Sequence, residues 1–186
     1  MTNIKNANIL ITGGASGIGK IMGRLALQKG AKSLIIWDVN AEALAETKAE
    51  FSLLGTVYTY TVNIADSDAV ITTYKRVKEE CGNVDILINN AGVFYFNDLC
   101  KTAEARINLM LHLHIRTVTQ MCRLFGMDMR ERGKGYILNM SSMSAWMTMP
   151  GIQCYNASKS YILNFSRSMW YEMKPHGVIV TAICPG

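Results

Sequence analysis

Near the N-terminus the sequence reads Asn8-Ile9-Leu10-Ile11-Thr12-Gly13-Gly14-Ala15-Ser16-Gly17-Ile18-Gly19, a short apolar run that leads into a glycine-rich turn. The run predicts a buried strand. Apolar residues then recur at helical spacing until a stop at Gly30, and these are Ile18, Ile21, Met22 and Leu25. A glycine-rich turn between a strand and a helix lets the backbone approach a pyrophosphate, and the helix N-terminus offers unpaired N–H groups. The glycine spacing differs from G-x-G-x-x-G, so a simple tight turn is the alternative.

The next apolar run, residues 33–37, ends at Asp38, about 20 residues beyond the glycine turn, where an adenosine-ribose acid is expected. A carboxylate there accepts hydrogen bonds from the ribose hydroxyls and repels a 2′-phosphate. Because no Arg or Lys lies within the turn or directly after Asp38, NAD(H) is favoured over NADP(H). The alternative makes Asp38 a turn residue before Asn40, which would cap the following helix.

Strand-like and helical stretches alternate along the whole chain. We expect strands near 8–12, 33–38, 56–62, 84–89, 135–140 and 177–183, and helices near 17–30, 41–54, 67–81, 103–132 and 153–174. This alternation predicts an α/β fold, a doubly wound, mainly parallel sheet of the Rossmann type. With 186 residues and 49% hydrophobic content, a single domain over residues 1–186 is expected.

Three polar residues near position 150 suggest proton-transfer chemistry. Tyr155 and Lys159 lie at positions i and i+4 of a predicted helix, so their side chains share one face, and Ser142 precedes them. A nearby cation favours the phenolate form of a tyrosine, which makes the phenol a usable acid or base. A serine hydroxyl suits holding a carbonyl oxygen beside it. Taken alone, the pair also fits an ordinary half-exposed contact on a helix.

These segments, in this order and spacing, resemble one known family. Thr12-Gly13-Gly14-Ala15-Ser16-Gly17-Ile18-Gly19, Asn89-Asn90-Ala91-Gly92, Ser142 and Tyr155-x-x-x-Lys159 together resemble the short-chain dehydrogenase/reductase family, up to Pro185-Gly186. The resemblance implies an NAD(H)-dependent oxidoreductase that interconverts a secondary alcohol and a ketone by hydride transfer. Tyr155 would be the acid/base and Ser142 would position the substrate oxygen. Lys159 would assist Tyr155 and bind the nicotinamide ribose.

The resemblance also implies which residues surround the dinucleotide. Residues 89–92 would stabilise the central sheet and flank the cofactor, although alone they also fit a strand-ending turn. Asn63 ends the third predicted strand, where the family usually has an aspartate that contacts adenine, and its amide can still accept a hydrogen bond. The implied cofactor-binding residues are Thr12, Gly13, Ser16, Gly17, Ile18, Gly19, Asp38, Asn63, Asn90, Ala91, Gly92, Tyr155, Lys159, Pro185 and Gly186.

One position departs from the family's pattern. The family has a fourth catalytic residue, an asparagine, in the long helix before Ser142, and counting back from residues 129–133 puts His114 in its place. Asn108 is a competing candidate, but six residues turn a helix by roughly 240°, so it would face elsewhere. In the family this position helps to hold a water that links Lys159 to solvent. His114 would preserve that contact, add a titrating proton relay, or be a plain helix residue.

The chain ends at Gly186, whereas family members continue past this Pro-Gly pair with a substrate lid and a final parallel strand. We therefore expect these 186 residues to be a fragment that lacks the family's last strand. This expectation leaves an alternative function open. The chain would then be a dinucleotide-binding but catalytically incomplete fragment, or a non-catalytic sensor.

Residues 143–153 and 94–96 should border the substrate. They are rich in methionine and aromatic side chains, which predicts a small hydrophobic carbonyl or alcohol as the substrate, with core packing as the alternative. In the family, the helices near 103–132 and 153–174 form subunit interfaces. A homodimer or homotetramer is therefore implied.

Composition excludes several other classes. The formal net charge of +5 is dispersed except at residues 130–134, so we expect no nucleic-acid partner. The five cysteines lack metal-ligand or CxxC spacing, and no metal site is expected. Residues 1–7 are short and polar, and no apolar run approaches the length of a membrane span. A soluble, cytoplasmic protein is the resulting expectation.

Overall fold

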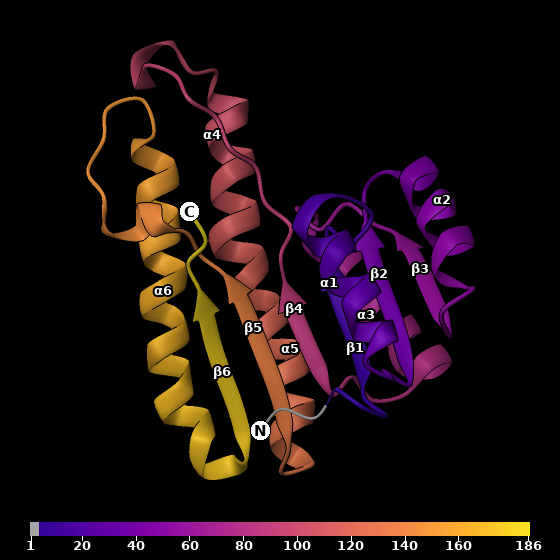
Figure 1. Ribbon diagram of the computed structural model, residues 1–186. Helices are drawn as coiled ribbons and strands as arrows, with labels where there is room; N and C mark the ends of the chain where they lie inside the picture. The colour runs from indigo at the N-terminus through magenta and orange to yellow at the C-terminus, as the bar shows by residue number, and fades with distance from the viewer. Residues whose placement is uncertain (1–3) are drawn as a thin grey trace.

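The computed structural model describes residues 4–186 (Figure 1). In this part of the chain, the centre is a six-stranded, all-parallel sheet in the order β3-β2-β1-β4-β5-β6. The strands are β1 (Asn8–Thr12), β2 (Ser33–Asp38), β3 (Val57–Thr61), β4 (Ile86–Asn89), β5 (Gly135–Met140) and β6 (Val178–Ile183). The predicted doubly wound fold is confirmed. The winding reverses between β1 and β4, which is where such sheets bind ligands, outside the carboxyl ends of the strands.

The helices connect successive strands and pack against the sheet. They are α1 (Gly17–Gln28), α2 (Ala41–Phe51), α3 (Ser67–Cys81), α4 (Glu104–Leu111), α5 (Val118–Glu131) and α6 (Gln153–Met173). Short 3-10 turns are η1 (Leu99–Lys101), η3 (Met143–Trp146) and η4 (Lys174–His176). Each predicted strand and helix has a counterpart near its expected bounds, apart from the single helix expected over 103–132.

The segment 103–132 is interrupted by a wide helical turn. A π-helical segment, η2 (His112–Thr117), joins α4 to α5, and the three together form one long rod (Figure 1). The prediction of one continuous α-helix was therefore wrong in detail. A π turn bonds residue i to i+5, and such turns occur frequently at functional sites. Apolar periodicity alone does not reveal this local widening.

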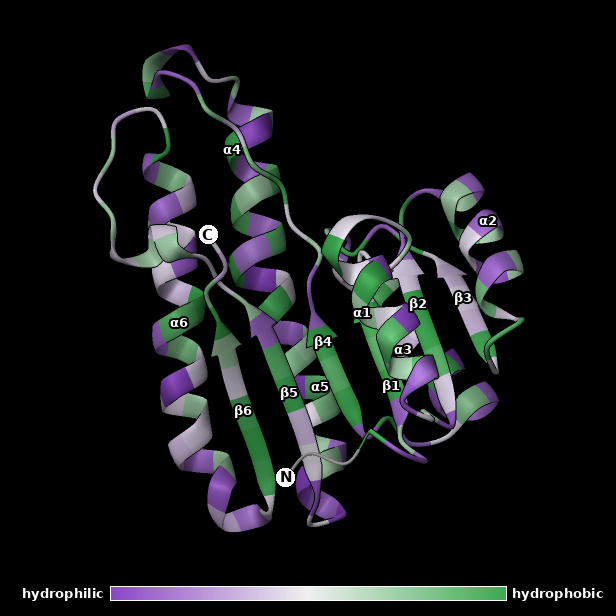
Figure 2. Ribbon diagram, viewed as in Figure 1, coloured by the Kyte–Doolittle hydropathy of each residue, from purple (hydrophilic) through white to green (hydrophobic). Residues whose placement is uncertain are grey.

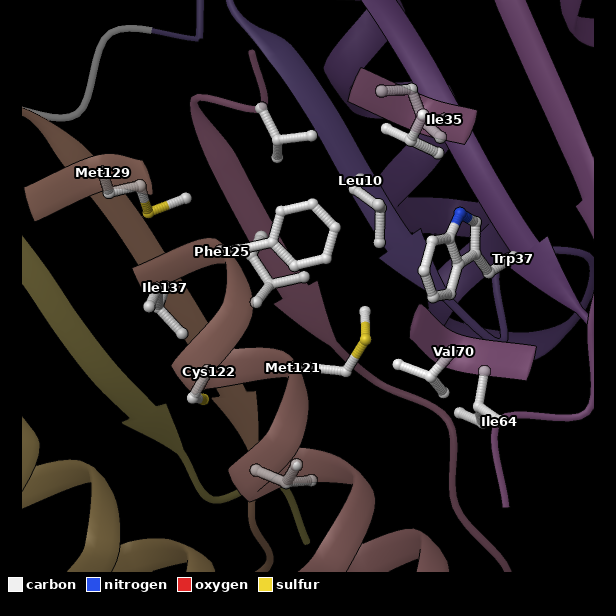
Figure 3. Close-up of a cluster of buried hydrophobic side chains, with 14 of the residues drawn as sticks. Leu10, Ile35, Trp37, Ile64, Val70, Met121, Cys122, Phe125, Met129 and Ile137 are labelled. Carbon is white, nitrogen blue, oxygen red and sulfur yellow. The ribbon is translucent and has the colours of Figure 1, made fainter. Parts of the chain in front are cut away.

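Two apolar clusters lie on opposite faces of the sheet. Alternate strand residues face one cluster, which α3, α5 and α6 also join. Its strand members include Leu10, Ile35 and Ile137 (Figure 3). The intervening strand residues, including Ile9, Ile36 and Ile88, join α1 and α2 in the second cluster. Both faces of the central strands are buried, so these strands are hydrophobic along most of their length (Figure 2).

The face that α1 turns to the sheet differs from the one its apolar periodicity indicates. Ile18, Ile21 and Leu25 are 50%, 60% and 47% exposed. The buried positions of α1 are instead Gly19, Gly23, Ala26 and Leu27. Close approach is the physical reason, because a Cβ added at Gly19 would lie 2.4 Å from the backbone oxygen of Gly13. Small residues therefore face inward along α1 up to Ala26, Leu27 is buried near its end, and the larger apolar residues Ile18, Ile21 and Leu25 are left outside.

This arrangement predicts opposite effects for two alanine substitutions in α1. Gly19→Ala should lower the free energy of unfolding by about 1–3 kcal/mol, since the new methyl group collides with backbone. Ile21→Ala should change it by less than about 0.5 kcal/mol, as expected of an exposed side chain. Urea denaturation measures both values. A larger loss in Ile21→Ala than in Gly19→Ala would contradict the observed orientation of the helix.

Candidate active site

The glycine-rich turn is tied to the segment that follows β4. Gly13 and Gly17 have φ values of +65° and +51°, in the left-handed region that favours glycine. The hydroxyl of Thr12 accepts hydrogen bonds from the backbone N–H groups of Asn90 and Ala91, both at 3.1 Å. Asn90 Nδ2 donates to the backbone oxygens of Thr12 and Gly13, both at 3.1 Å. Four hydrogen bonds thus hold two strand ends together at the carboxyl edge of the sheet.

The first turn of α1 offers hydrogen-bond donors next to this tie. Ser16 is the N-cap residue of α1, and within the described residues its side chain makes no capping hydrogen bond. A Cβ added at Gly17 would meet no atom within 4 Å, so the space beside the turn is open. Because the first N–H groups of a helix lack intrahelical acceptors, this end of α1 is suited to a phosphate.

Asp38 lies at the end of β2, beside the glycine turn. Its carboxylate accepts hydrogen bonds from the backbone N–H groups of Ala15 and Asn40, both at 3.1 Å. Asn40 is the N-cap of α2, and its side chain accepts a hydrogen bond from the N–H of Ala43 at 3.0 Å. Asp38 also borders the large cavity described below. The turn interpretation of Asp38 is therefore correct, and the ribose role stays a prediction.

A buried polar network crosses the sheet below the site. Asn89 Nδ2 donates to Asn139 Oδ1 at 2.8 Å, and Asn139 Nδ2 donates to Ser166 Oγ at 2.9 Å. The network links β4, β5 and α6. It includes Asn139 and Ser166, which were not singled out from the sequence, although a polar residue inside the apolar run at 135–140 was an available signal.

Lys159 is held in the interior by the carboxyl end of β5. Its side chain points into the protein, 5% exposed, and Nζ donates to the backbone oxygen of Met140 at 2.9 Å. The backbone oxygen of Lys159 accepts a hydrogen bond from Ser141 Oγ at 2.8 Å. Burial lowers the pKa of Lys159 to about 8, while the nearby Cys184 thiol acts in the opposite direction. The ammonium group is therefore fixed against the end of β5, and its burial makes the charged form of Lys159 less favourable.

Tyr155 lies one helical turn before Lys159, as the sequence predicts. Lys159 Nζ is 5.5 Å from the centroid of the Tyr155 ring. The ring packs edge-on against Phe94 and His114, with centroid distances of 5.0 and 5.8 Å. Ser142 begins the η3 turn directly after β5, and its Oγ accepts a hydrogen bond from the Ser144 N–H at 3.1 Å.

His114 lies inside η2 with 1% of its surface exposed. Its Nε2 accepts a hydrogen bond from the backbone N–H of Val93 at 3.1 Å, and its Nδ1 lies 2.8 Å from Ser158 Oγ. Burial, together with the charge of Lys159, lowers the pKa of His114 to about 3. The imidazole is therefore neutral at ordinary pH.

A single cavity of about 900 Å³ brings most of the predicted residues together. Its walls include Gly13, Ser16, Gly17, Ile18, Asp38, Asn63, Asn90, Ala91, Gly92, His114, Ser142, Tyr155, Lys159, Pro185 and Gly186. Thr12 and Gly19 do not line it, because Thr12 is bound beneath the turn and Gly19 faces the turn's backbone. The cavity also includes Trp37, Val62 and Ile64, at and just beyond the ends of β2 and β3, which sequence reasoning missed.

Residues 4–186 contain no group of three or more His, Cys, Asp or Glu side chains arranged to hold a metal ion. None of their helices combines the length and apolar character needed to cross a membrane.

The parallel sheet, the glycine turn and the cavity at its carboxyl edge define a doubly wound α/β domain whose cavity lies where such sheets bind ligands. The model of the short chain dehydrogenase family matches residues 7–186. The chain belongs to this family.

Known proteins place the chain among larger relatives. It is 33% identical over 180 residues to the "Probable oxidoreductase EphD" of Mycobacterium tuberculosis, covering 96% of this chain and 30% of that protein. It is 30% identical over 181 residues to "Estradiol 17-beta-dehydrogenase 11" of Homo sapiens, covering 95% and 60% respectively. The chain thus spans less than two thirds of the length of these curated relatives.

Solved structures share the fold. An NAD+-bound xylitol dehydrogenase superposes with a TM-score of 0.93 at 24% identity, covering 100% of this chain and 72% of that one. A metagenomic short-chain oxidoreductase in complex with NADP has the same TM-score and identity, with 100% and 84% covered. At this identity the likeness establishes the architecture.

Burial of Lys159 predicts a measurable pH dependence of stability. Its pKa is about 8 in the folded protein against 10.5 for a free lysine, so between these values the unfolded chain holds more protons and stability rises with pH. Relative to Lys159→Met, the wild type should gain up to about 3 kcal/mol in the free energy of unfolding between pH 8 and 10.5. Urea denaturation at several pH values measures this gain.

The control for this experiment is Lys174→Met, which removes an exposed lysine just after α6. Its pH slope should match that of the wild type. If Lys159→Met also keeps the wild-type slope, the charge of Lys159 is not buried in the way the structure indicates.

Proposed function

We propose that this protein is an NAD(H)-dependent oxidoreductase that interconverts a secondary alcohol and a ketone. One observation carries the proposal. The Ser142, Tyr155 and Lys159 side chains border the same cavity as the glycine turn and Asp38. A dinucleotide site and an acid/base group in one cavity are the two parts that hydride transfer requires.

The walls of the cavity fit the cofactor. Glycines at positions 13 and 17 leave room for backbone to approach a pyrophosphate, and the open first turn of α1 supplies N–H donors. Asp38 would accept hydrogen bonds from the adenosine ribose, and Asn63 would meet the adenine. Bound there, the nicotinamide ring would accept or supply the hydride. Pro185 and Gly186 would close the nicotinamide end of the site.

The residues of the chain would handle the proton. Ser142 would hold the substrate oxygen while the Tyr155 hydroxyl donates a proton to it, or takes one from the alcohol in the reverse direction. Lys159 uses one of its three N–H groups on Met140, which leaves two for a ribose hydroxyl and a water.

Asp38 is the basis for proposing NAD(H) over NADP(H). Its carboxylate borders the cavity and would repel a 2′-phosphate. Relatives of this fold have been solved with either cofactor, so the preference rests on this chain's own residues.

The substrate we propose is hydrophobic. Phe94, Met143 and Trp146, on the segments that follow β4 and β5, are 57%, 52% and 62% exposed, and Phe94 packs on the Tyr155 ring. Apolar side chains left open beside an acid/base group favour an apolar ketone or alcohol. The name of the human relative, an estradiol dehydrogenase, agrees with such a substrate. Subunit pairing through α4, α5 and α6 is part of the same proposal, by family resemblance.

Tyr155→Phe tests the acid/base assignment. We expect kcat to fall by at least about 100-fold, because general acid/base groups contribute 10²–10⁴-fold, while the Kd for NADH stays within about threefold. NADH absorbance with a panel of hydrophobic ketones and secondary alcohols measures turnover, and fluorescence titration measures binding.

Tyr171→Phe is the matched control, since Tyr171 lies on the same helix and is 74% exposed. It should leave both quantities unchanged. Turnover retained in Tyr155→Phe would refute the assignment, and NADH binding without any turnover in the wild type would favour a non-catalytic binding protein.

Asp38→Asn tests cofactor choice. The wild type should bind NADH at least about tenfold more tightly than NADPH, a difference of about 1.4 kcal/mol, and the variant should reduce this ratio because the repelling charge is gone. Asp66→Asn is the control, since Asp66 also accepts hydrogen bonds from two backbone N–H groups, at the start of α3. A wild-type preference for NADPH would contradict the proposal.

A further inference from the structure

Three hydrogen bonds in series join the cofactor-facing loop after β4 to the first turn of α6. The Val93 N–H donates to His114 Nε2 at 3.1 Å, and His114 Nδ1 lies 2.8 Å from Ser158 Oγ. The Ser158 hydroxyl donates to the backbone oxygen of Tyr155 at 2.8 Å. His114 is thus the middle of a link that ends on the residue bearing the phenol.

The donors and acceptors in this series determine which nitrogen of the His114 imidazole carries a proton. A backbone N–H can only donate, so Nε2 of His114 must be unprotonated. The Ser158 hydroxyl has one hydrogen, which it gives to the Tyr155 oxygen, so it must accept from His114 Nδ1–H. His114 is therefore the neutral tautomer with its proton on Nδ1.

The packing around the ring leaves little freedom for another arrangement. His114 is 1% exposed and lies in the π turn η2, and Ser158 is fully buried. A Cβ added at Gly92 would lie 2.7 Å from His114 Nε2, so the loop approaches the ring as closely as a glycine allows. The Tyr155 ring packs edge-on against the same imidazole.

We propose that His114 is a positioning residue, a neutral clamp that sets Tyr155 at a fixed place relative to the cofactor-facing loop. The proposal rests on the proposed function, because the position of Tyr155 matters only if its phenol transfers the proton. Of the roles expected for His114 from the sequence, this proposal excludes the titrating proton relay, because the side chain acts by holding Tyr155 in place.

A relay through the imidazole would break the clamp. Protonation of Nε2 would place two N–H groups, those of His114 and Val93, against each other at 3.1 Å. A protonated imidazole would also be a buried positive charge close to the positive charge of Lys159. Burial, together with the charge of Lys159, lowers the pKa of His114 to about 3. The proton route of the site must therefore pass elsewhere.

The first test needs neither cofactor nor substrate. In ¹⁵N-histidine NMR of the whole chain, His114 should remain the neutral Nδ1–H tautomer from pH 5.5 to 8.5. The chain has three histidines, so the signal lost in His114→Phe identifies it. A His114 that titrates in this range, or that carries its proton on Nε2, overturns the clamp even if the protein proves to have no turnover.

The second test asks whether the clamp reaches the chemistry. Ser158→Ala should lower kcat by about five- to tenfold, the effect of one lost hydrogen bond, while substrate KM and the Kd for NADH stay within twofold. Ser168→Ala, an exposed serine on the same helix, should leave all three unchanged. An unchanged kcat in Ser158→Ala overturns the positioning role.

Amide exchange keeps the clamp testable if turnover is absent. The Val93 N–H should exchange at least about tenfold faster in His114→Phe, which cannot accept its hydrogen bond. In His114→Gln the side-chain oxygen can replace Nε2, and exchange should return close to the wild-type rate. Equal exchange rates in the wild type and His114→Phe would show that the Val93 bond is not formed.

Discussion

The site depends on one constraint, the need to satisfy backbone polar groups where the parallel strands end. Beyond the last ladder bond, carbonyl and N–H groups of the chain lack strand partners, and a buried group left unpaired is costly. Side chains supply the partners here. Asn90 binds the oxygens of Thr12 and Gly13, and Lys159 binds the oxygen of Met140. The residues that finish the sheet are therefore the residues that surround the cavity.

Lys159 illustrates how this constraint shapes reactivity. Within residues 4–186 its ammonium binds one backbone oxygen, and no carboxylate forms an ion pair with it. A buried charge without an ionic partner destabilises the fold, which is why its pKa falls to about 8. The same incomplete pairing leaves positive charge directed at the Tyr155 ring and N–H groups free for a ligand. Pairing Lys159 with a carboxylate would stabilise the protein and would occupy the N–H groups that are now left for a ligand.

The sequence predicts most of the fold because the alternation of apolar runs leaves few topologies to consider. It does not predict which face of α1 is buried. Periodicity selects large apolar residues, whereas the contact with the glycine turn selects small ones, so Gly19 is buried and Ile21 is exposed. It also misses the π turn at His114, because a widened turn has no compositional pattern. Most of the motif residues border the cavity, although Thr12 and Gly19 do not, and the hydrogen bonds that orient them come from tertiary packing.

Asp38 shows that a structural and a functional interpretation need not compete at such a strand end. Each of its carboxylate oxygens accepts one backbone N–H, from Ala15 and from Asn40, and so it fixes the turn before α2. An ionised carboxylate has about four acceptor positions, so roughly half would remain for the ribose hydroxyls of the proposed cofactor. The two backbone hydrogen bonds also hold the carboxylate in place, which would lower the entropy lost if the proposed cofactor binds. A residue that is required for the turn is thereby prepared for the ligand, and the same reasoning applies to His114, whose role in packing is what would fix Tyr155.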